Sequence, residues 1–164
     1  MIACVFLCNP LKAQDAPAKS HEDLGWELLG EERFGPLKLG MPLSEVLKAL
    51  GEPTEKTDPV EWGADGRIHQ SYTYMALGLS LDIVGEKRER TLNMIEARPP
   101  CKFRTSKHVG IGDNMDDVQA LYMQYLDPEF STSDTLVAGS IYGGIIFSGE
   151  EGRVAYIFFG AMAE

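Results

Sequence analysis

Cysteine is scarce in this 164-residue chain, and two of its three cysteines lie within the first eight residues. Beyond residue 18 only Cys101 remains, so that part of the chain has no internal disulfide to form. A single cysteine also excludes the paired cysteine spacings of zinc and redox sites. The hydrophobic fraction of 44% is nevertheless ordinary for a globular chain and too high for a disordered one.

Basic side chains are also few: 15 Lys and Arg stand against 25 Asp and Glu, for a net charge of −10. Phosphate contacts require a basic surface, so this balance argues against nucleic acid as the main partner. It argues equally against general binding to anionic membranes. Seven of the 15 basic residues do fall between positions 87 and 107, where they predict either contact with an acidic partner or a solvated turn and linker.

Catalytic motifs are missing as well: the chain has no GxSxG, Walker A or dinucleotide-binding glycine pattern. The three histidines lie far apart in the sequence, at His21, His69 and His108. None of them has a carboxylate or cysteine at metal-ligand spacing. An enzyme would need groups such as His69 with Asp82 or Glu61 to converge in a cleft. The acidic cluster at 113–117 lacks the glycine and distal glutamate of an EF-hand. We therefore predict a non-enzymatic protein with no metal and no cofactor.

Long hydrophobic runs are missing too, since no stretch approaches the ~20 residues that span a bilayer. Residues 1–18 hold a short apolar run and small residues at possible cleavage positions, after Ala13 or Ala18, which predicts a signal peptide. It lacks a basic segment, which indicates a truncated leader; a disordered tail is the alternative. Ile2-Ala3-Cys4 resembles the end of a lipobox, so a lipid anchor on Cys4 is a further option. The expected location is periplasmic or secreted.

After an expected linker over 19–34, the clearest element is a helix that begins at Pro42, since proline fits the first helical position. Leu43, Val46, Leu47 and Leu50 recur at helical spacing, and Gly51 is a stop signal. Strands are predicted over 67–75, 77–84 and 91–97 from their content of branched, aromatic and alternating apolar residues. Two prolines at 99–100 end this stretch.

The same pattern then recurs, with Gly112 and Val118 following Gly40 and Val46 by an identical 72 residues. Asp113 is the predicted cap of a second helix that ends near 127–128, and strands are expected over 141–148 and 153–160. We predict an α+β fold of two tandem helix-plus-antiparallel-sheet repeats, 35–100 and 101–164, with the helices packed on one face of the sheet. The alternative is two unrelated short helices in one α+β domain.

The two stretches Leu39-Gly40-x5-Val46 and Ile111-Gly112-x5-Val118, each leading into strands, resemble the tandem units of the β-lactamase inhibitor protein family and related small lipoproteins of outer-membrane assembly. The resemblance covers residues 33–161. It implies units of a helical hairpin on an antiparallel sheet, with adjoining sheets and a concave face that binds protein partners. The inhibitor carries disulfides, unlike this chain, and no residues match an inhibitory contact set, so a β-lactamase target is not implied.

Aromatic residues gather in or beside the predicted strands. Five are the candidate partner-binding residues: Trp62, Tyr74, Tyr142, Tyr156 and Phe158. Exposed aromatics on a sheet serve as interface anchors, whereas the alternative for each is a place in the core. Both faces of the last strand are apolar, so that strand is either central or presents an apolar patch.

The expected function is therefore a secreted or cell-envelope binding module, of inhibitor, immunity or scaffold type. It would present a sheet face to a protein partner. The alternative is a small-molecule or lipid-binding envelope protein with a pocket between sheet and helices.

Overall fold

The computed structural model describes residues 19–162. The predicted signal peptide and the lipid anchor on Cys4 lie outside the described residues. Within 19–162, every helix is too short or too polar to cross a membrane.

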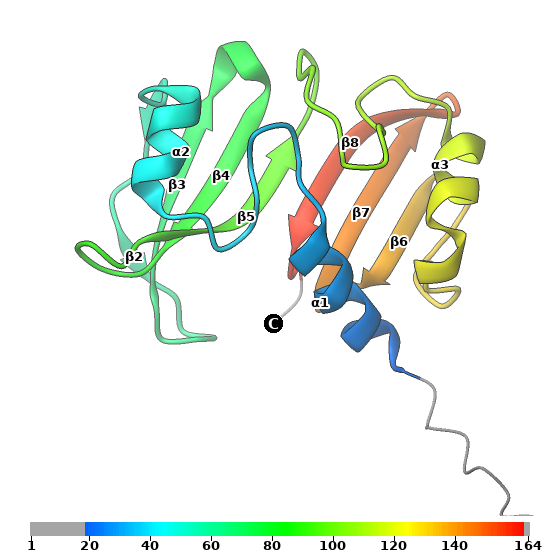
Figure 1. The fold of residues 1–164 in the computed structure, drawn as a ribbon, viewed down its shortest axis with the longest axis horizontal. Helices are drawn as coiled ribbons and strands as arrows, with labels where there is room; N and C mark the ends of the chain where they lie inside the picture. The colour runs from blue at the N-terminus through cyan, green and yellow to red at the C-terminus, as the bar shows by residue number, and fades with distance from the viewer. Residues whose placement is uncertain (1–18, 163–164) are drawn as a thin grey trace, which may run out of the picture.

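One antiparallel sheet forms the body of the molecule, in the strand order β1-β3-β4-β5-β8-β7-β6, with β2 also paired to β3 (Figure 1). The strands are β1 Glu55–Lys56, β2 Val60–Glu61, β3 Ile68–Tyr74, β4 Leu79–Val84, β5 Thr91–Ala97, β6 Thr135–Ser140, β7 Gly143–Glu150 and β8 Arg153–Gly160. The predicted strand regions are confirmed, and β8 is central, between β5 and β7. Strand β6 was not predicted, because it is short and is interrupted by a glycine.

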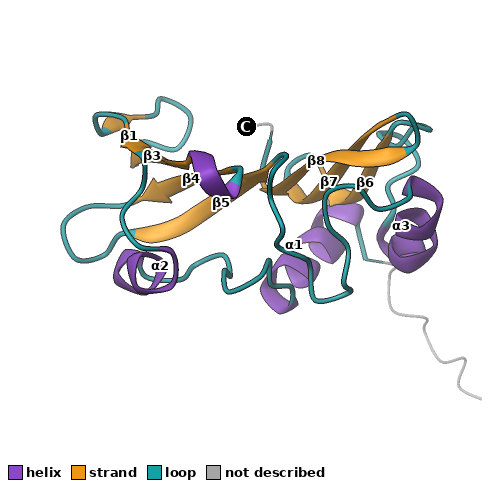
Figure 2. Cartoon of the chain, turned by 90° about the horizontal axis from the view of Figure 1, so that it is seen from above, coloured by secondary structure: helices purple, strands orange, loops and turns teal. Residues whose placement is uncertain are grey.

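Three α-helices lie along one face of this sheet and leave the other face uncovered (Figure 2). They are α1 His21–Glu31, α2 Leu43–Leu50 and α3 Met115–Tyr122, with short 3₁₀ turns at Met75–Leu77 and Met123–Tyr125. An α+β fold with helices on one face is therefore present. Helix α2 precedes the strands β1 to β5 and α3 precedes β6 to β8, whereas the family resemblance implied a helical hairpin before each group of strands.

The segment 19–34, expected to be a linker, instead contains α1. Ser20 caps this helix, because its hydroxyl accepts the Asp23 N–H while the Asp23 carboxylate accepts the Ser20 N–H. Leu28 and Leu29 are buried in the main core. The helical pattern was hidden because glycines interrupt it.

A close approach of backbones explains one of these glycines. A Cβ on Gly25 would overlap the carbonyl oxygen of Gly143, and one on Gly139 would overlap Gly25 itself. Gly139 also has a φ of +97°, a conformation that favours glycine. Helix α1 therefore packs directly on the backbone of the β6–β7 hairpin, because none of the three positions carries a side chain.

The main core lies between the sheet and the helices. Leu79, Leu81 and Ile83 of β4 point into it, together with Ile157 and Phe159 of β8. This alternation is the period-two pattern predicted from the sequence. The largest fully buried side chains in this space include Tyr122, Phe34, Phe147 and Leu37.

The start of α2 is hydrogen-bonded to β5 of the same half. The Gly40 N–H donates to the Leu92 carbonyl over 2.8 Å, and the Leu92 N–H donates to Met41 over 2.9 Å. The Leu43 N–H donates to the Arg90 carbonyl over 2.9 Å. These bonds fix the helix against the first residues of the strand.

The start of α3 is bonded to β8 in the same way. The Gly112 N–H donates to the Val154 carbonyl over 2.7 Å, and the Val154 N–H donates to the backbone carbonyl of Asp113 over 2.9 Å. The Met115 N–H donates to the Gly152 carbonyl over 3.0 Å. The two strands that receive these helix starts, β5 and β8, are also the two that pair at the centre of the sheet.

Candidate binding surface on the open face

The uncovered side of the sheet, here called the open face, carries the side chains that alternate with the core. Cross-strand partners share a face, so the successive pairings β3–β4, β4–β5, β5–β8, β8–β7 and β7–β6 define its members. They are His69, Ser71, Thr73, Ser80, Asp82, Val84, Thr91, Met94, Glu96, Tyr156, Phe158, Ile146, Ser148, Thr135 and Val137. The face is therefore polar over β3 and β4 and apolar over β8, β7 and β6.

A groove of about 380 Å³ opens on this face where its polar and apolar parts meet. Its lining combines aromatic rings, thioethers and one carboxylate: Trp62, Met94, Glu96, Tyr156, Phe158, Ala161 and Met162. Three of the five predicted partner-binding residues are thus brought together from two distant segments of the chain. The two methionines were not predicted, because no pattern in the sequence distinguishes them from core residues.

Phe158 forms the floor of this groove. It is buried with Val137 and Ile146 in a small second cluster, against which Met94, Ile141 and Tyr156 pack. Its predicted exposure is therefore wrong, although its predicted side of the sheet is right. Phe158 supports the surface from beneath, whereas Tyr156 and Trp62 remain partly accessible.

Two predicted residues lie elsewhere. Tyr74 is buried on the helix side, and its hydroxyl donates to the Gly51 carbonyl over 3.1 Å. It is therefore not part of an exposed sheet surface, because its strand position points to the core. Tyr142 is 49% exposed at the β6–β7 turn but does not line the groove.

Trp62 is held in place by a buried polar cluster. Its indole stacks on the His69 ring, with centroids 3.8 Å apart and planes 2° apart. His69 Nδ1 lies 2.7 Å from Asp82 Oδ2, and His69 Nε2 lies 3.1 Å from Asp65 Oδ2. The Asn93 amide also donates to Asp82 Oδ2 over 3.0 Å. The loop that carries Trp62 is thereby tied to β3 and β4.

The chemistry of this cluster favours anchoring. A carboxylate only accepts hydrogen bonds, so both His69 contacts are satisfied when the ring carries a proton on each nitrogen. The His69 side chain is only 1% exposed, since Trp62 covers it. His69 does contact Asp82, which is one of the pairings that a catalytic role would require. The Trp62 indole, however, covers the His69 ring.

Asp65 completes the turn that precedes β3. The Arg67 N–H donates to Asp65 Oδ1 over 2.9 Å, and this bond is the main reason that the pKa of Asp65 is lowered, with the His69 contact adding to it. The Gly66 N–H donates to the Trp62 carbonyl over 2.8 Å and closes the turn. The turn therefore places Trp62 against the face of the His69 ring and Asp65 at its Nε2 edge.

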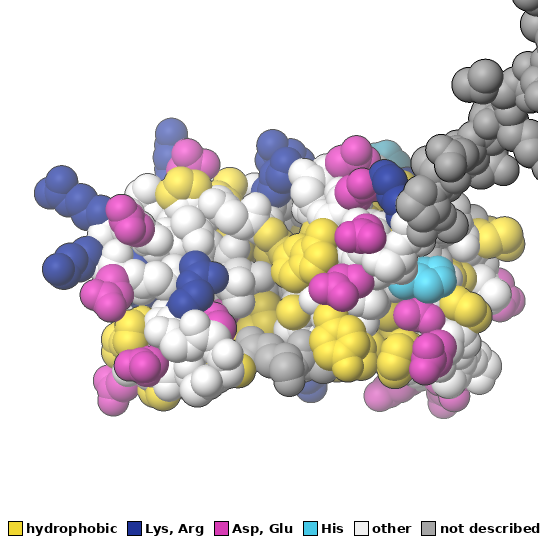
Figure 3. Space-filling model, turned by 90° about the horizontal axis from the view of Figure 1, so that it is seen from below, with side chains coloured by type: hydrophobic (Ala, Val, Ile, Leu, Met, Phe, Trp, Pro, Cys, Tyr) yellow, Lys and Arg dark blue, Asp and Glu magenta, His cyan; other side chains and the backbone are white. Residues whose placement is uncertain are grey.

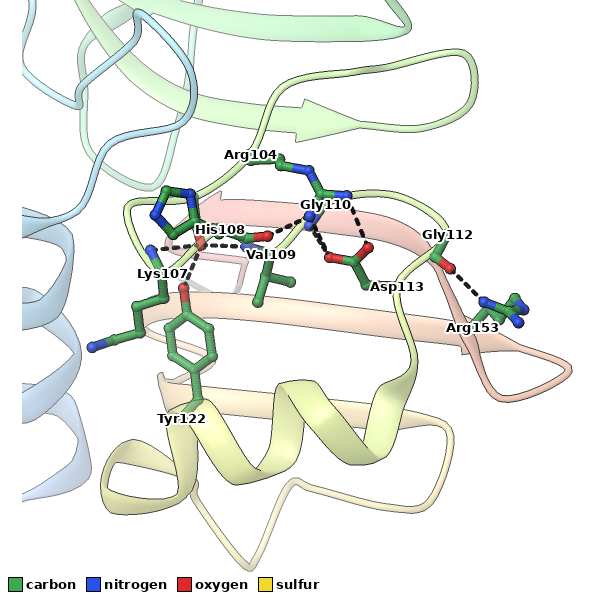
Figure 4. Close-up of polar contacts among 10 residues, drawn as sticks. Arg104, Lys107, His108, Val109, Gly110, Gly112, Asp113, Tyr122 and Arg153 are labelled. Atoms are coloured by element: carbon green, nitrogen blue, oxygen red, sulfur yellow. Dashed lines mark hydrogen bonds and ion pairs between the residues drawn. The ribbon is translucent and has the colours of Figure 1, made fainter.

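A second polar network stabilises the loop before α3 (Figure 4). Arg104 binds both oxygens of Asp113, at 2.7 and 3.0 Å, and Asp113 also accepts the Gly110 N–H. The predicted helix cap at Asp113 is therefore wrong by one residue: Asn114 caps α3 by accepting the Asp116 N–H over 2.7 Å. Asp113 is drawn away from the cap position because Arg104 offers it a bidentate, charge-assisted partner.

The seven basic residues between 87 and 107 do not form one surface. Lys and Arg side chains gather mainly toward the end of the molecule that carries β3 and β4 (Figure 3). Elsewhere Arg104 is paired with Asp113, and the Lys107 ammonium lies 5.7 Å from the centroid of the Tyr122 ring. The stretch is thus divided among separate local contacts.

Neither cysteine nor metal chemistry stands out in the described part of the chain. Cys101 is buried, and burial raises the pKa of its thiol, which keeps it in the unreactive form. Over residues 19–162, no three His, Cys, Asp or Glu side chains are placed to hold a metal ion.

The chain was compared with protein-family models, with curated proteins and with solved structures, and none of them matches it.

Proposed function

We propose that this protein is a non-enzymatic binding module of the cell envelope or secreted space that presents its open face to a protein partner. The groove around Trp62 and Tyr156 carries the proposal, because it places partly accessible aromatic rings over a firm apolar floor on a sheet face that no helix covers. Buried floors with aromatic rims are typical of interface hot spots. The shielding of His69 supports a binding role over a catalytic one.

The face is a better candidate than the edges of the sheet. At one edge, the Asp127 N–H donates to the Val137 carbonyl and the Thr132 N–H donates to Thr135, so the loop after α3 covers part of β6. At the other edge, the short strands β1 and β2 pair with β3. Covered edges resist pairing with a further strand, so a partner would contact side chains on the face.

We also propose that the chain is a tandem repeat related to the β-lactamase inhibitor family. The matched backbone bonds at the two helix starts support this: the helix residues of the second set follow those of the first by 72 positions, and the strand residues by 62. Each helix therefore docks on the last strand of its own half, and those strands pair at the centre of the sheet.

The proposed export agrees with the position of α1. Cleavage after Ala13 or Ala18 would leave Ser20, the helix cap, intact. A lipid on Cys4 would instead retain residues 5–18 as a tether. Mass spectrometry of the N-terminus of protein isolated from its natural source distinguishes these two forms.

Affinity capture from a native envelope fraction tests the protein-binding role. Immobilised wild-type chain should retain a discrete protein that a Tyr156→Ala chain does not retain. Tyr142→Ala is the matched control, because Tyr142 is an exposed aromatic residue outside the groove. Failure to retain any protein, combined with a thermal shift caused by an envelope lipid extract, would contradict the proposal and favour the small-molecule alternative.

A further inference from the structure

We infer that the groove receives an arginine side chain of the protein partner, which packs on Tyr156 and pairs with Glu96 in the place that Arg98 occupies in the free protein. The inference rests on the proposed function and names the chemistry by which the groove would recognise its partner.

The first argument is that a guanidinium of this chain, which does not itself line the groove, already lies over Tyr156 and beside Glu96. The Arg98 guanidinium carbon lies 4.7 Å from the centroid of the Tyr156 ring, and Arg98 Nη2 lies 3.5 Å from Glu96 Oε2. A planar cation over an aromatic face beside a carboxylate is an attractive arrangement. The Arg98 side chain is 67% exposed, so solvent screens the ion pair, and the screened pair holds Arg98 only weakly. It is therefore a displaceable occupant.

The second argument is that the groove is built before any partner arrives. The tyrosine and the carboxylate stand on neighbouring central strands, β8 and β5, and Glu96 pairs in register with Phe158. Across the groove, Trp62 is fixed by its stack on His69. A pre-formed site loses little side-chain freedom on binding, so a second guanidinium could replace the first without rearrangement of the sheet.

The third argument is charge complementarity. The chain carries a net charge of −10, and Glu96 contributes a carboxylate directly to the groove lining. The carboxylates of Asp65 and Asp82 contact the His69 ring on which Trp62 stacks, and Asp82 Oδ1 is buried without a hydrogen-bond partner among the described residues. Negative potential around aromatic walls favours a cationic side chain over a neutral or acidic one.

The test uses the full-length, ¹⁵N-labelled chain and two small probes, Nα-acetyl-arginine amide and Nα-acetyl-citrulline amide. The probes have nearly the same shape, but citrulline carries a neutral urea in place of the guanidinium. The arginine probe should shift the Trp62 indole and Arg98 side-chain resonances in a saturable way, and the citrulline probe should not. Equal shifts with both probes, or none up to the millimolar range, would overturn the inference.

Two variants sharpen the test. Arg98→Ala removes the resident cation and should tighten binding of the arginine probe by about two- to fivefold, whereas Glu96→Gln should weaken it by a similar factor. Glu150→Gln is the control, because it removes the same charge from an exposed carboxylate at the β7–β8 turn. An unchanged affinity in Arg98→Ala and Glu96→Gln would contradict the inference even if the probe binds.

The outcome is separable from that of the affinity capture. Capture that depends on Tyr156 but is unaffected by Glu96→Gln would support the protein-binding function and overturn the arginine inference. Probe binding without capture of any protein would support the guanidinium site and overturn the proposed partner.

Discussion

The indole of Trp62 lies flat on the imidazole of His69, with the ring centroids 3.8 Å apart. Trp62 belongs to the loop between β2 and β3, and His69 to β3 itself, so the stack joins the rim of the groove to the sheet. Because His69 in turn contacts Asp82 of β4, the position of an accessible aromatic residue depends on a buried polar pair.

Substitution of His69 should therefore have two effects. His69→Ala leaves the buried Asp82 carboxylate with only the Asn93 amide as a hydrogen-bond donor among the described side chains, which should lower the free energy of unfolding by about 3 kcal/mol in urea denaturation. It also removes the support of Trp62, so in a Trp26→Phe background the emission of Trp62 should shift to longer wavelength. A loss of less than about 0.5 kcal/mol in His69→Ala is what an ordinary surface substitution causes. A loss that small would contradict a structural role for the pair.

The contact of α1 with the β6–β7 hairpin predicts a difference between two glycines of one helix. Gly25→Ala should destabilise the protein by about 2 kcal/mol or more, because its methyl group would overlap the Gly143 carbonyl. Gly30→Ala should be neutral or stabilising by up to about 1 kcal/mol, since nothing lies within 4 Å of that position. Thermal or urea unfolding of both variants measures the difference. Similar effects at both positions would show that the close approach is unimportant.

The Arg104–Asp113 pair predicts an acid dependence of stability. Burial of the Asp113 carboxyl acts to raise its pKa, but the bonds from Arg104 and Gly110 outweigh this and hold the pKa below its ordinary value. A carboxyl with a lowered folded pKa stabilises the protein above its unfolded pKa, and this contribution is lost as pH falls through the folded pKa. The urea midpoints of wild type and Asp113→Asn should differ at neutral pH and converge in acid.

Asp116→Asn is the control for that series. Asp116 lies in the first turn of α3, and no hydrogen bond or ion pair joins its side chain to Arg104 in the described structure. Its difference from wild type should be smaller and should vary less with pH. A constant gap between wild type and Asp113→Asn from neutral to acidic pH would argue against the pair as the cause.

Tyr156 reports on the groove through its phenol. Burial raises the pKa of Tyr156 to about 12, and the charge of Glu96 adds to the rise while Arg98 opposes it. Glu96→Gln should therefore lower this pKa and Arg98→Ala should raise it, as measured by NMR of ¹³C-labelled tyrosine. Equal values in all three proteins would contradict the proximity of these charges to the ring.

The raised value also has a consequence for stability. The neutral phenol is favoured in the folded state, so its contribution is complete below the unfolded pKa of about 10 and is lost as pH rises through about 12. The Tyr156→Phe variant has no phenol to ionise, so this part of the loss of stability at alkaline pH should be absent from it. The difference between wild type and Tyr156→Phe in unfolding free energy, measured from pH 9 upward, checks the sign.

Much of the fold was predictable from the sequence because its signals are local. The stripe Leu43, Val46, Leu47 and Leu50 predicted α2, and the period-two alternation of β4 predicted which side chains enter the core. The elements that were missed have weak local signals: α1 is interrupted by Gly25 and Gly30, and the role of Gly25 depends on Gly139 and Gly143, more than a hundred residues away.

The candidate site was predictable only in part, for the same physical reason. Aromatic residues near strands can be chosen from the sequence, and Trp62 and Tyr156 do line the same groove. Alternation along one strand, however, does not say which face of the sheet a helix will cover. Tyr74 points to the core and Tyr156 to the groove because the helices pack on one side only.

By itself the sequence determined the helices α2 and α3, the strands β3, β4, β5, β7 and β8, the core alternation and the 72-residue recurrence, since these depend on neighbouring residues and on spacing. The tertiary structure alone decided the location of α1, the pairing of β5 with β8, and the burial of His69 with Asp82 under Trp62. Each of these joins residues from separate segments, and its stability comes from contacts that exist only once the chain has folded.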